Sequence, residues 1–377
     1  MSGLLPHVDP DGLLEYSVVY TDRSLNHMSQ RFQQVMRDIS ASLKGLYRAE
    51  SVVVVPGSGT FGMEAVARQF ATGKRCLVIR NGWFSYRWSQ IFEAGAIVAD
   101  EKVLKARSVA PGFQAAFAPA PIEEVVAAIR ADKPDLVFAA HVETAAGMLL
   151  PDHYIRAVAE AVHEVGGMLV LDCIASGTLW VDMDACGVDV LLSAPQKGWS
   201  SSPCCGLVML SKLARERIEH TQSTSFACDL KKWLQIMEAY EQGGHAYHAT
   251  MPTDALTRFR DTIRETEALG FSLLKERQQQ LGERVRGMLT ARGIKSVAAD
   301  GFAAPGVVVC YTEDAGIKSG SKFAAEGLQI AAGVPLQCDE PADFQTFRLG
   351  LFGLDKLQDV DRTVATLERA LDQVLRG

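Results

Sequence analysis

Two short apolar runs, each followed directly by polar residues, constrain the fold of this chain more than any other feature. The runs are Met168–Leu171 and Val188–Leu192, and turn residues bound both of them. Short apolar runs with branched side chains and turn signals at both ends are typical of strands buried on both faces of a sheet. Asp172 follows the first run, and Gln196 and Lys197 follow the second. The pattern predicts that an acid and an amine follow the carboxyl ends of two buried strands.

Asp172 and Lys197 are expected to converge, because ligands of open α/β sheets bind outside the carboxyl ends of the strands. A lysine amine in a lined pocket can form a Schiff base, and a carboxylate that faces a pyridine nitrogen keeps that nitrogen protonated. This pair therefore has the chemistry that pyridoxal phosphate requires. The same residue types also occur as a helix cap and a solvated loop lysine, so the pair alone leaves both interpretations open.

A second candidate site follows the four valines of Val52–Val55, where PGSGT precedes a helical pattern over Phe61–Phe70. A strand, a glycine-rich turn and a helix form an anion site, because backbone N–H groups and the positive helix end face the anion. Ser58, Gly59 and Thr60 occupy that turn. An ordinary tight turn with a helix cap would have the same sequence.

Strand and helix patterns alternate through Leu210, which predicts a doubly wound, mostly parallel sheet. Further strands are expected at 75–80, 97–99 and 136–140, and helices at 26–46, 122–129 and 154–165. After residue 211 we expect helices at 233–240 and 254–292, the latter broken near Gly270, and then a smaller alternation of strands (307–311, 346–351) and helices (318–326, 360–375).

Three parts are therefore predicted along the chain. They are an N-terminal segment near the active site (1–25), a large domain (26–253), and an interdomain helix with a small α+β C-terminal domain (254–377).

Charge and composition narrow the function classes. A net charge of -7 argues against a nucleic-acid-binding surface, and 48% hydrophobic with 22% charged residues is typical of a soluble globular protein. No apolar run approaches the ~20 residues of a membrane helix, and no basic stretch precedes an apolar one at the N-terminus, so neither a membrane anchor nor a signal peptide is expected. The eight cysteines are scattered without a CxxC pair, which favours a cytoplasmic protein without structural zinc or another metal site.

Seven pieces of the chain, in order, resemble the class V aminotransferases of the fold-type I pyridoxal phosphate superfamily, nearest the alanine–glyoxylate and serine–pyruvate branch. The resemblance runs from about Ser29 to the C-terminus. Its pieces are GSGT and MEA within Gly57–Ala65, Asn81-Gly82 before aromatic residues, His141-x-Glu143-Thr144 with Gly147, Asp172, Gln196-Lys197, Tyr247-His248-x-Thr250-x-Pro252 and Phe347-Arg348-x-Gly350-Leu351-x-Gly353. It implies a large domain around a mostly parallel, seven-stranded sheet and a small α+β C-terminal domain.

The resemblance implies the catalytic roles. Lys197 is similar to the Schiff-base lysine, which also moves the substrate proton, and Asp172 to the partner of the pyridine nitrogen. Arg348 resembles the arginine that binds the substrate α-carboxylate, for which a planar guanidinium is well suited.

The other cofactor contacts follow from the same resemblance. Ser58, Gly59, Thr60 and Gln196 match the phosphate site, and Thr144 matches the donor to the ring hydroxyl. Phe84 is the stacking aromatic by register, with Trp83 as the alternative. Tyr247 and Thr250 match residues that reach the phosphate of a neighbouring subunit, which implies a homodimer with shared active sites.

The implied reaction is transfer of an amino group from alanine or serine to glyoxylate or pyruvate. The GSGTF turn also resembles that of 2-aminoethylphosphonate–pyruvate aminotransferases. A lyase or cysteine desulfurase would need a mobile nucleophilic cysteine, for which Cys338 is the candidate, but desulfurases have a histidine where this chain has Gln196. A binding module without catalysis is a third alternative, against which the retention of Lys197, Asp172 and Arg348 argues.

The N-terminal segment departs from the family pattern, which leaves the substrate open. Most relatives have a Gly-Pro-rich segment beside the substrate, where this chain has Glu15–Arg23. Tyr16, Tyr20 and Arg23 are candidates either for contacts with a polar or acidic substrate side chain or for packing and subunit contacts.

Overall fold

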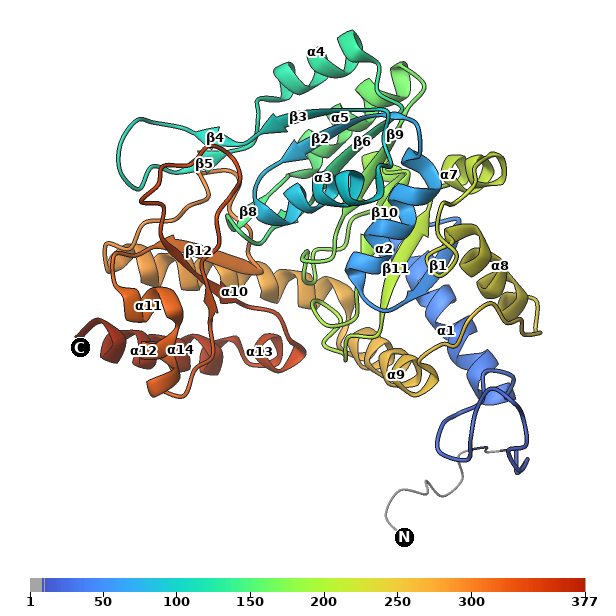
Figure 1. Cartoon of the computed structure of the whole chain (residues 1–377). Helices are drawn as coiled ribbons and strands as arrows, with labels where there is room; N and C mark the ends of the chain where they lie inside the picture. Colours follow the sequence, from blue (N-terminus) through green and yellow to red (C-terminus); the bar gives the residue numbers. More distant parts are fainter. Residues whose placement is uncertain (1–8, 10, 377) are drawn as a thin grey trace.

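A seven-stranded sheet forms the centre of the chain in the computed structural model, which describes residues 9 and 11–376 (Figure 1). The strands follow the order β1-β11-β10-β9-β6-β2-β3. Neighbours from β10 through β3 are parallel, whereas β11 is antiparallel to both β1 and β10. The strands are β1 (Ser51–Pro56), β2 (Arg75–Arg80), β3 (Asp100–Lys105), β6 (Leu136–Ala140), β9 (Met168–Asp172), β10 (Val190–Ser193) and β11 (Cys205–Leu210). The predicted mostly parallel sheet is confirmed.

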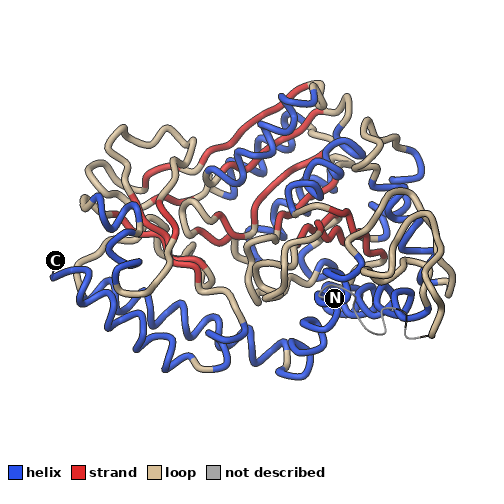
Figure 2. Tube along the Cα trace, turned by 60° about the horizontal axis from the view of Figure 1, so that its bottom comes forward, coloured by secondary structure: helices blue, strands red, loops and turns tan. Residues whose placement is uncertain are grey.

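Helices flank this sheet (Figure 2). Every residue of β6 and β9 is buried, so both faces of the sheet centre are covered. The helices of this part are α1 (Gln30–Tyr47), α2 (Gly59–Val66) with a π-helical end (Ala67–Ala71), α3 (Trp83–Gly95), α4 (Ile122–Asp132), α5 (Asp152–Glu164), α6 (Met183–Cys186), α7 (Lys212–Arg217) with a 3₁₀ turn (Ile218–His220), and α8 (Leu230–Glu241).

Helix α1 illustrates how the sequence specifies an element. Its apolar residues recur at helical spacing and are all buried in the main core: Phe32, Val35, Met36, Ile39 and Leu43. The Ser29 hydroxyl caps the helix by accepting a hydrogen bond from the Phe32 N–H at 3.1 Å. The cap explains why the helix begins at Gln30 and not at residue 26, where the apolar pattern alone placed it.

The C-terminal part has its own three-stranded antiparallel sheet, in the order β12-β14-β13. Leu274, Phe323, Phe347 and Leu371 belong to a separate hydrophobic core there. Gly270, at φ 93°, separates α9 from α10 as predicted, because that backbone angle suits glycine. The elements are α9 (Thr253–Leu269), α10 (Phe271–Ala291), β12 (Val307–Tyr311), α11 (Ala315–Ser319), α12 (Ser321–Ala325), β13 (Ala331–Ala332), β14 (Thr346–Gly350), α13 (Leu354–Gln358) and α14 (Val360–Arg376). The predicted small α+β unit is confirmed, whereas the domain limits remain a prediction.

A third apolar cluster joins the two parts. It combines residues of the large part, such as Phe117 and Met148, with residues of the C-terminal part, such as Val309 and Leu336. Two short hairpins lie at this junction, β4 (Arg107–Ser108) with β5 (Phe117–Ala118) and β7 (Val142–Glu143) with β8 (Met148–Leu149).

Three local predictions were wrong or incomplete. The strand expected at 97–99 lies instead at β3, an edge strand of mostly charged residues that pairs with β2 and has little apolar signal. The helix expected at 318–326 is split into α11 and α12 at Gly320, whose φ is 79°. The aromatic cluster after Gly82 forms the first turns of α3, a helix that the sequence interpretation missed.

The segment before α1 projects away from the sheet and has no regular structure over residues 12–23 (Figure 1). The Tyr20 hydroxyl donates to the Met251 carbonyl at 2.9 Å, and the Leu25 N–H donates to Asp254 at 3.1 Å. The segment is thus tied to the start of α9. Part of the predicted N-terminal unit, residues 1–8 and 10, lies outside the described residues. Within the described chain, no helix has the length and apolarity to cross a bilayer.

Candidate active site

One cavity of about 190 Å³ collects most of the predicted site residues at the carboxyl ends of the sheet strands. β1 leads to the Ser58–Thr60 turn, β9 ends at Asp172, and the loop after β10 provides Gln196 and Lys197. These strands run in one direction, so their carboxyl ends share an edge of the sheet. The lining residues are Ser58, Gly59, Thr60, Met63, Phe84, Arg87, Val142, Thr144, Asp172, Ile174, Ala175, Gln196 and Lys197.

The turn at the start of α2 has the features of an anion site. Ser58 is the N-cap residue, yet its hydroxyl makes no capping hydrogen bond. Gly59 is packed so closely that an added Cβ would lie 2.6 Å from Ile174 Cδ1. The Arg87 guanidinium donates to the Thr60 hydroxyl at 3.1 Å, and the buried Gln196 Oε1 has no hydrogen-bond partner among the residues that the structure describes. Free backbone N–H groups, a free hydroxyl and a nearby cation favour a phosphate-sized anion.

Asp172 and Lys197 both lose solvation in this cavity. Burial raises the pKa of Asp172 to about 6, and the carboxylate of Glu143 adds to the rise, although the Ile174 N–H donates to Asp172 at 2.8 Å. Burial lowers the pKa of Lys197, and the positive charge of Arg348 lowers it further. The amine is therefore more readily neutral than an exposed lysine, and the acid would be stabilised by a cation placed beside it.

Glu143 fixes the part of α3 that carries Phe84. Its fully buried carboxylate accepts four hydrogen bonds, from the N–H groups of Phe84 (3.2 Å), Ser85 (2.8 Å) and Ala145 (2.9 Å) and from the Ser85 hydroxyl (2.8 Å). Burial raises the pKa of Glu143, while these hydrogen bonds oppose the rise. Gly82 makes room for the carboxylate, since an added Cβ there would lie 2.7 Å from Glu143 Cδ.

Phe84, and not Trp83, lines the cavity in the structure. The Trp83 ring packs instead against Tyr86, with ring centres 5.8 Å apart. Phe84, which the sequence register favoured over Trp83, therefore lies where a stacking aromatic would be needed. Its stacking role remains a prediction.

Arg348 reaches the same region from β14 of the C-terminal sheet. Its guanidinium carbon lies 5.6 Å from the centre of the Phe84 ring, and its Nε donates to the Ala332 carbonyl at 2.8 Å. The guanidinium of Arg87 lies 5.2 Å from the same ring centre. Two cations therefore flank Phe84, one from each part of the chain.

Arg348, Tyr247 and Thr250 are the predicted site residues that do not line this cavity, and of these only Arg348 lies next to one of its lining residues, Phe84. Tyr247 is 54% exposed, and its hydroxyl lies 3.3 Å from Thr250 Oγ1. The Tyr247 ring packs against His27, with ring centres 5.6 Å apart.

Arg87, Glu143 and Phe352 are the residues of this region to which the sequence interpretation gave no role. Phe352 lies with its ring centre 5.6 Å from Lys197 Nζ. Helical spacing was the available signal for Arg87, because residues 84 and 87 share a face of α3. For Glu143, which the sequence analysis named only as part of a motif, the signal was an acid three residues after a buried strand.

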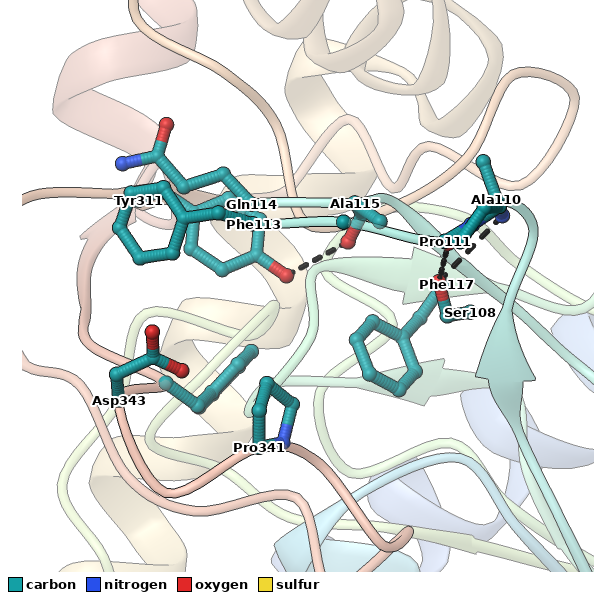
Figure 3. A pocket seen from close by; sticks show the side chains of 12 residues that line it. Ser108, Ala110, Pro111, Phe113, Gln114, Ala115, Phe117, Tyr311, Pro341 and Asp343 are labelled. Carbon is teal, nitrogen blue, oxygen red and sulfur yellow. Dashed lines mark hydrogen bonds between the residues drawn. The ribbon is translucent and has the colours of Figure 1, made fainter.

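A second cavity, of about 270 Å³, shares no lining residue with the first (Figure 3). Aromatic and proline side chains dominate its lining, including Phe113, Phe117, Tyr311 and Pro341, and the Tyr311 hydroxyl donates to the Ala115 carbonyl at 2.7 Å. Asp343 is the one carboxylate among its lining residues. None of the predicted site residues is among them, so this cavity is not the candidate active site.

Comparisons with known proteins show the family of this chain. A family model described as "Aminotransferase class-V" matches residues 12–343. The soluble hydrogenase small subunit of Synechococcus sp. is 25% identical over 354 residues, covering 93% of this chain and 88% of that protein. The alanine–glyoxylate aminotransferase of Rattus norvegicus is 24% identical over 360 residues, covering 93% and 82%. The solved structure of an alanine–glyoxylate aminotransferase from Nostoc sp. is similar with a TM-score of 0.77 and 22% identity, covering 93% and 88%.

The Glu143→Ala variant should lower the free energy of unfolding by about 3 kcal/mol, because it leaves buried N–H donors of α3 without an acceptor. Urea unfolding followed by circular dichroism measures the change. Glu283→Ala, at an exposed position on α10, is the control and should stay within about 0.5 kcal/mol of the parent. Equal effects of the two substitutions would show that the carboxylate does not anchor α3.

The Asp172→Asn variant should stabilise the ligand-free protein above about pH 6 by up to about 3 kcal/mol. The native pKa of Asp172 is raised from 3.8 to about 6, so its contribution to stability is complete below the unfolded pKa and is lost as the pH rises through the native pKa. Asparagine does not ionise and avoids this loss. Urea unfolding at several pH values tests the difference, with the exposed Asp300→Asn as control. Identical pH profiles for the parent and Asp172→Asn would contradict the burial effect.

Proposed function

Because the chain belongs to the class V aminotransferase family, whose members are generally pyridoxal phosphate-dependent, we propose that it transfers an amino group from alanine or serine to glyoxylate or pyruvate. The observation that carries the proposal is the convergence of Lys197, Asp172 and the Ser58–Thr60 turn in one cavity. Arg348, next to the Phe84 ring, adds a group suited to a substrate carboxylate.

The residues of the cavity fit pyridoxal phosphate. The free Ser58 hydroxyl, the side-chain amide N–H groups of Gln196 and the start of α2 would hold its phosphate. Asp172, costly to ionise by itself, would gain from a protonated pyridine nitrogen. When bound, the group supplies an aldehyde carbon to which amines bond and a ring that takes up electron density.

The chain's own residues divide the work of the reaction. Arg348 binds the substrate α-carboxylate with its planar guanidinium and so orients the Cα–H bond. The Lys197 amine, whose pKa is lowered by burial, accepts the proton from Cα. Asp172 keeps the pyridine nitrogen protonated.

Three further residues complete the proposed cofactor site. Thr144 and Phe84 both line the cavity, where Thr144 would donate to the ring hydroxyl and Phe84 would stack on the ring. Glu143 holds the backbone at Phe84 in place.

We further propose a homodimer in which Tyr247 and Thr250 of one copy reach the phosphate site of the other. Support comes from the 54% exposure of Tyr247 and from its absence among the residues that line the chain's own cavity. We also propose a cytoplasmic location, for which the scattered cysteines are the support.

The lyase and desulfurase alternative has little support from Cys338. Its thiol is buried, lies 3.3 Å from the Arg80 carbonyl, and has its pKa raised by burial. A mobile nucleophile must leave its pocket as a thiolate, which this contact and the raised pKa of Cys338 both oppose. The phosphonate alternative is better supported, because the second guanidinium, that of Arg87, also flanks Phe84. 2-Aminoethylphosphonate is therefore tested as an alternative amino donor in the experiment below.

Addition of L-alanine, without any keto acid, to the protein loaded with pyridoxal phosphate should abolish the long-wavelength (violet) absorbance band of the loaded protein and release about one pyruvate per subunit. The Lys197→Ala variant should do neither. An unchanged band with alanine and serine would refute the proposed donor, and 2-aminoethylphosphonate and cysteine then test the alternatives. A protein that acquires no band with pyridoxal phosphate would refute the whole proposal.

The Arg348→Lys variant should raise KM for the amino acid by about 10- to 100-fold, because a lysine replaces a planar two-pronged contact with a single point charge. Steady-state kinetics with the donor found above measures KM and kcat separately. The exposed Arg369→Lys on α14 is the matched control and should leave both values unchanged. A KM for Arg348→Lys equal to that of the control would exclude Arg348 from carboxylate binding.

A further inference from the structure

Two adjacent thiols lie directly behind the proposed phosphate turn. Cys205 is the first residue of β11 and Cys204 precedes it, and their sulfur atoms are 3.8 Å apart. Side chains of successive strand residues point to opposite faces, so this approach requires the backbone to turn at Cys204. Cys204 keeps 6% exposure, whereas Cys205 is fully buried.

The backbone around this pair is in close contact with the turn. The Gly57 N–H donates to the Cys204 carbonyl at 2.9 Å, and Cys205 pairs with Pro56 at the end of β1. At Gly206 an added Cβ would lie 2.9 Å from the Ser58 carbonyl oxygen. A change of backbone direction at Cys204 would therefore be transmitted to the segment that carries Ser58.

The two thiols differ in the way that a reacting pair requires. The hydrogen bond with Cys205 lowers the pKa of Cys204, whereas burial raises the pKa of Cys205. In a redox-active pair, the thiol that more readily ionises reacts first, and a second thiol next to it completes the disulfide.

We propose that Cys204 and Cys205 form a redox-active dithiol, which a hydroperoxide oxidises to a disulfide between the two neighbouring residues. The Cys204 thiolate attacks the terminal hydroperoxide oxygen, so that an S–O bond forms, the O–O bond breaks and the alcohol, or water, leaves with a proton. The Cys205 sulfur then attacks the Cys204 sulfur, the S–S bond forms, and the hydroxyl leaves as water with the Cys205 proton. The pair loses two electrons, and the hydroperoxide gains them.

Disulfide formation should loosen the anion turn. The sulfur atoms must move from 3.8 Å to a bonded distance of about 2.0 Å, which neighbouring residues reach only by rotation of the peptide between them. That rotation opposes the Gly57–Cys204 hydrogen bond and the Pro56–Cys205 pairing. This consequence rests on the proposed function, whereas the thiol chemistry does not.

Peptide mass spectrometry of the full-length protein tests the chemistry. After treatment with hydrogen peroxide, alkylation of free thiols and trypsin digestion, residues 198–212 form one peptide that contains both cysteines and no other. We expect this peptide to lose the mass of two hydrogens and to escape alkylation, with reversal by dithiothreitol. Cys204→Ser should abolish the mass loss, and Cys228→Ser, with a similar 7% exposure, should preserve it. Sulfinic or sulfonic acid at Cys204, or a failure to react while Cys228 is oxidised, would overturn the proposal.

Binding of pyridoxal phosphate, followed by quenching of tryptophan fluorescence, tests the consequence. The oxidised protein should bind it about tenfold more weakly than the reduced protein, the equivalent of about 1.4 kcal/mol, with recovery on reduction. Equal affinities despite the mass loss would overturn the coupling to the turn. No binding by the reduced protein would refute the proposed function, and the peptide analysis would still decide the thiol chemistry.

Discussion

The parallel pairing of β9 with β10 is the constraint on which the candidate site depends. Leu192 pairs with Asp172 in this register, so both strands end at the same level of the sheet. A shift of one residue would turn every side chain of a strand to the opposite face. The neighbouring pair of β6 with β9 sets Ala140 opposite Asp172 and brings Glu143 and Thr144 to the same edge. The strand register therefore brings Asp172, Lys197 and the Ser58–Thr60 turn together, and no long loop is needed to position them.

Buried charge is the second organising feature. Asp172 and Glu143 are buried acids, and Arg87, Lys197 and Arg348 are cations within reach of their fields. The two acids differ in their hydrogen bonds. Among the described residues, the Glu143 carboxylate accepts four, whereas the Asp172 carboxylate accepts one, from the Ile174 N–H. The satisfied acid holds the backbone together. Asp172, which has fewer donors, can still accept a hydrogen bond or a positive charge from a ligand. Burying such an acid lowers the stability of the ligand-free protein.

The sequence predicted best what depends on local order along the chain. Asp172 ends a buried strand, and Lys197 and the 58–60 turn follow buried strands within four residues, so strand patterns were sufficient to place them at one edge. Arg348 needed the family resemblance, because its position depends on how the C-terminal sheet packs against the large part. Glu143 and Arg87 were missed as functional residues, since their partners are Phe84, Ser85 and Thr60, on other elements. The edge strand β3 was misplaced because most of its residues are charged. It pairs with β2 through its backbone, so the sequence shows no apolar pattern there.

The antiparallel strand β11 has a consequence for the order in which the molecule can be completed. β1 ends at the anion turn, but its pairing partner is a strand that the chain reaches only after all the other strands of the large sheet. During synthesis, which proceeds from the N-terminus, β1 must wait for Cys205 to leave the ribosome before the first register pair, Pro56 with Cys205, can close. The anion turn is therefore among the last parts of the large sheet to mature, and a nascent chain stopped before β11 would hold the acid of β9 without a formed cradle opposite it.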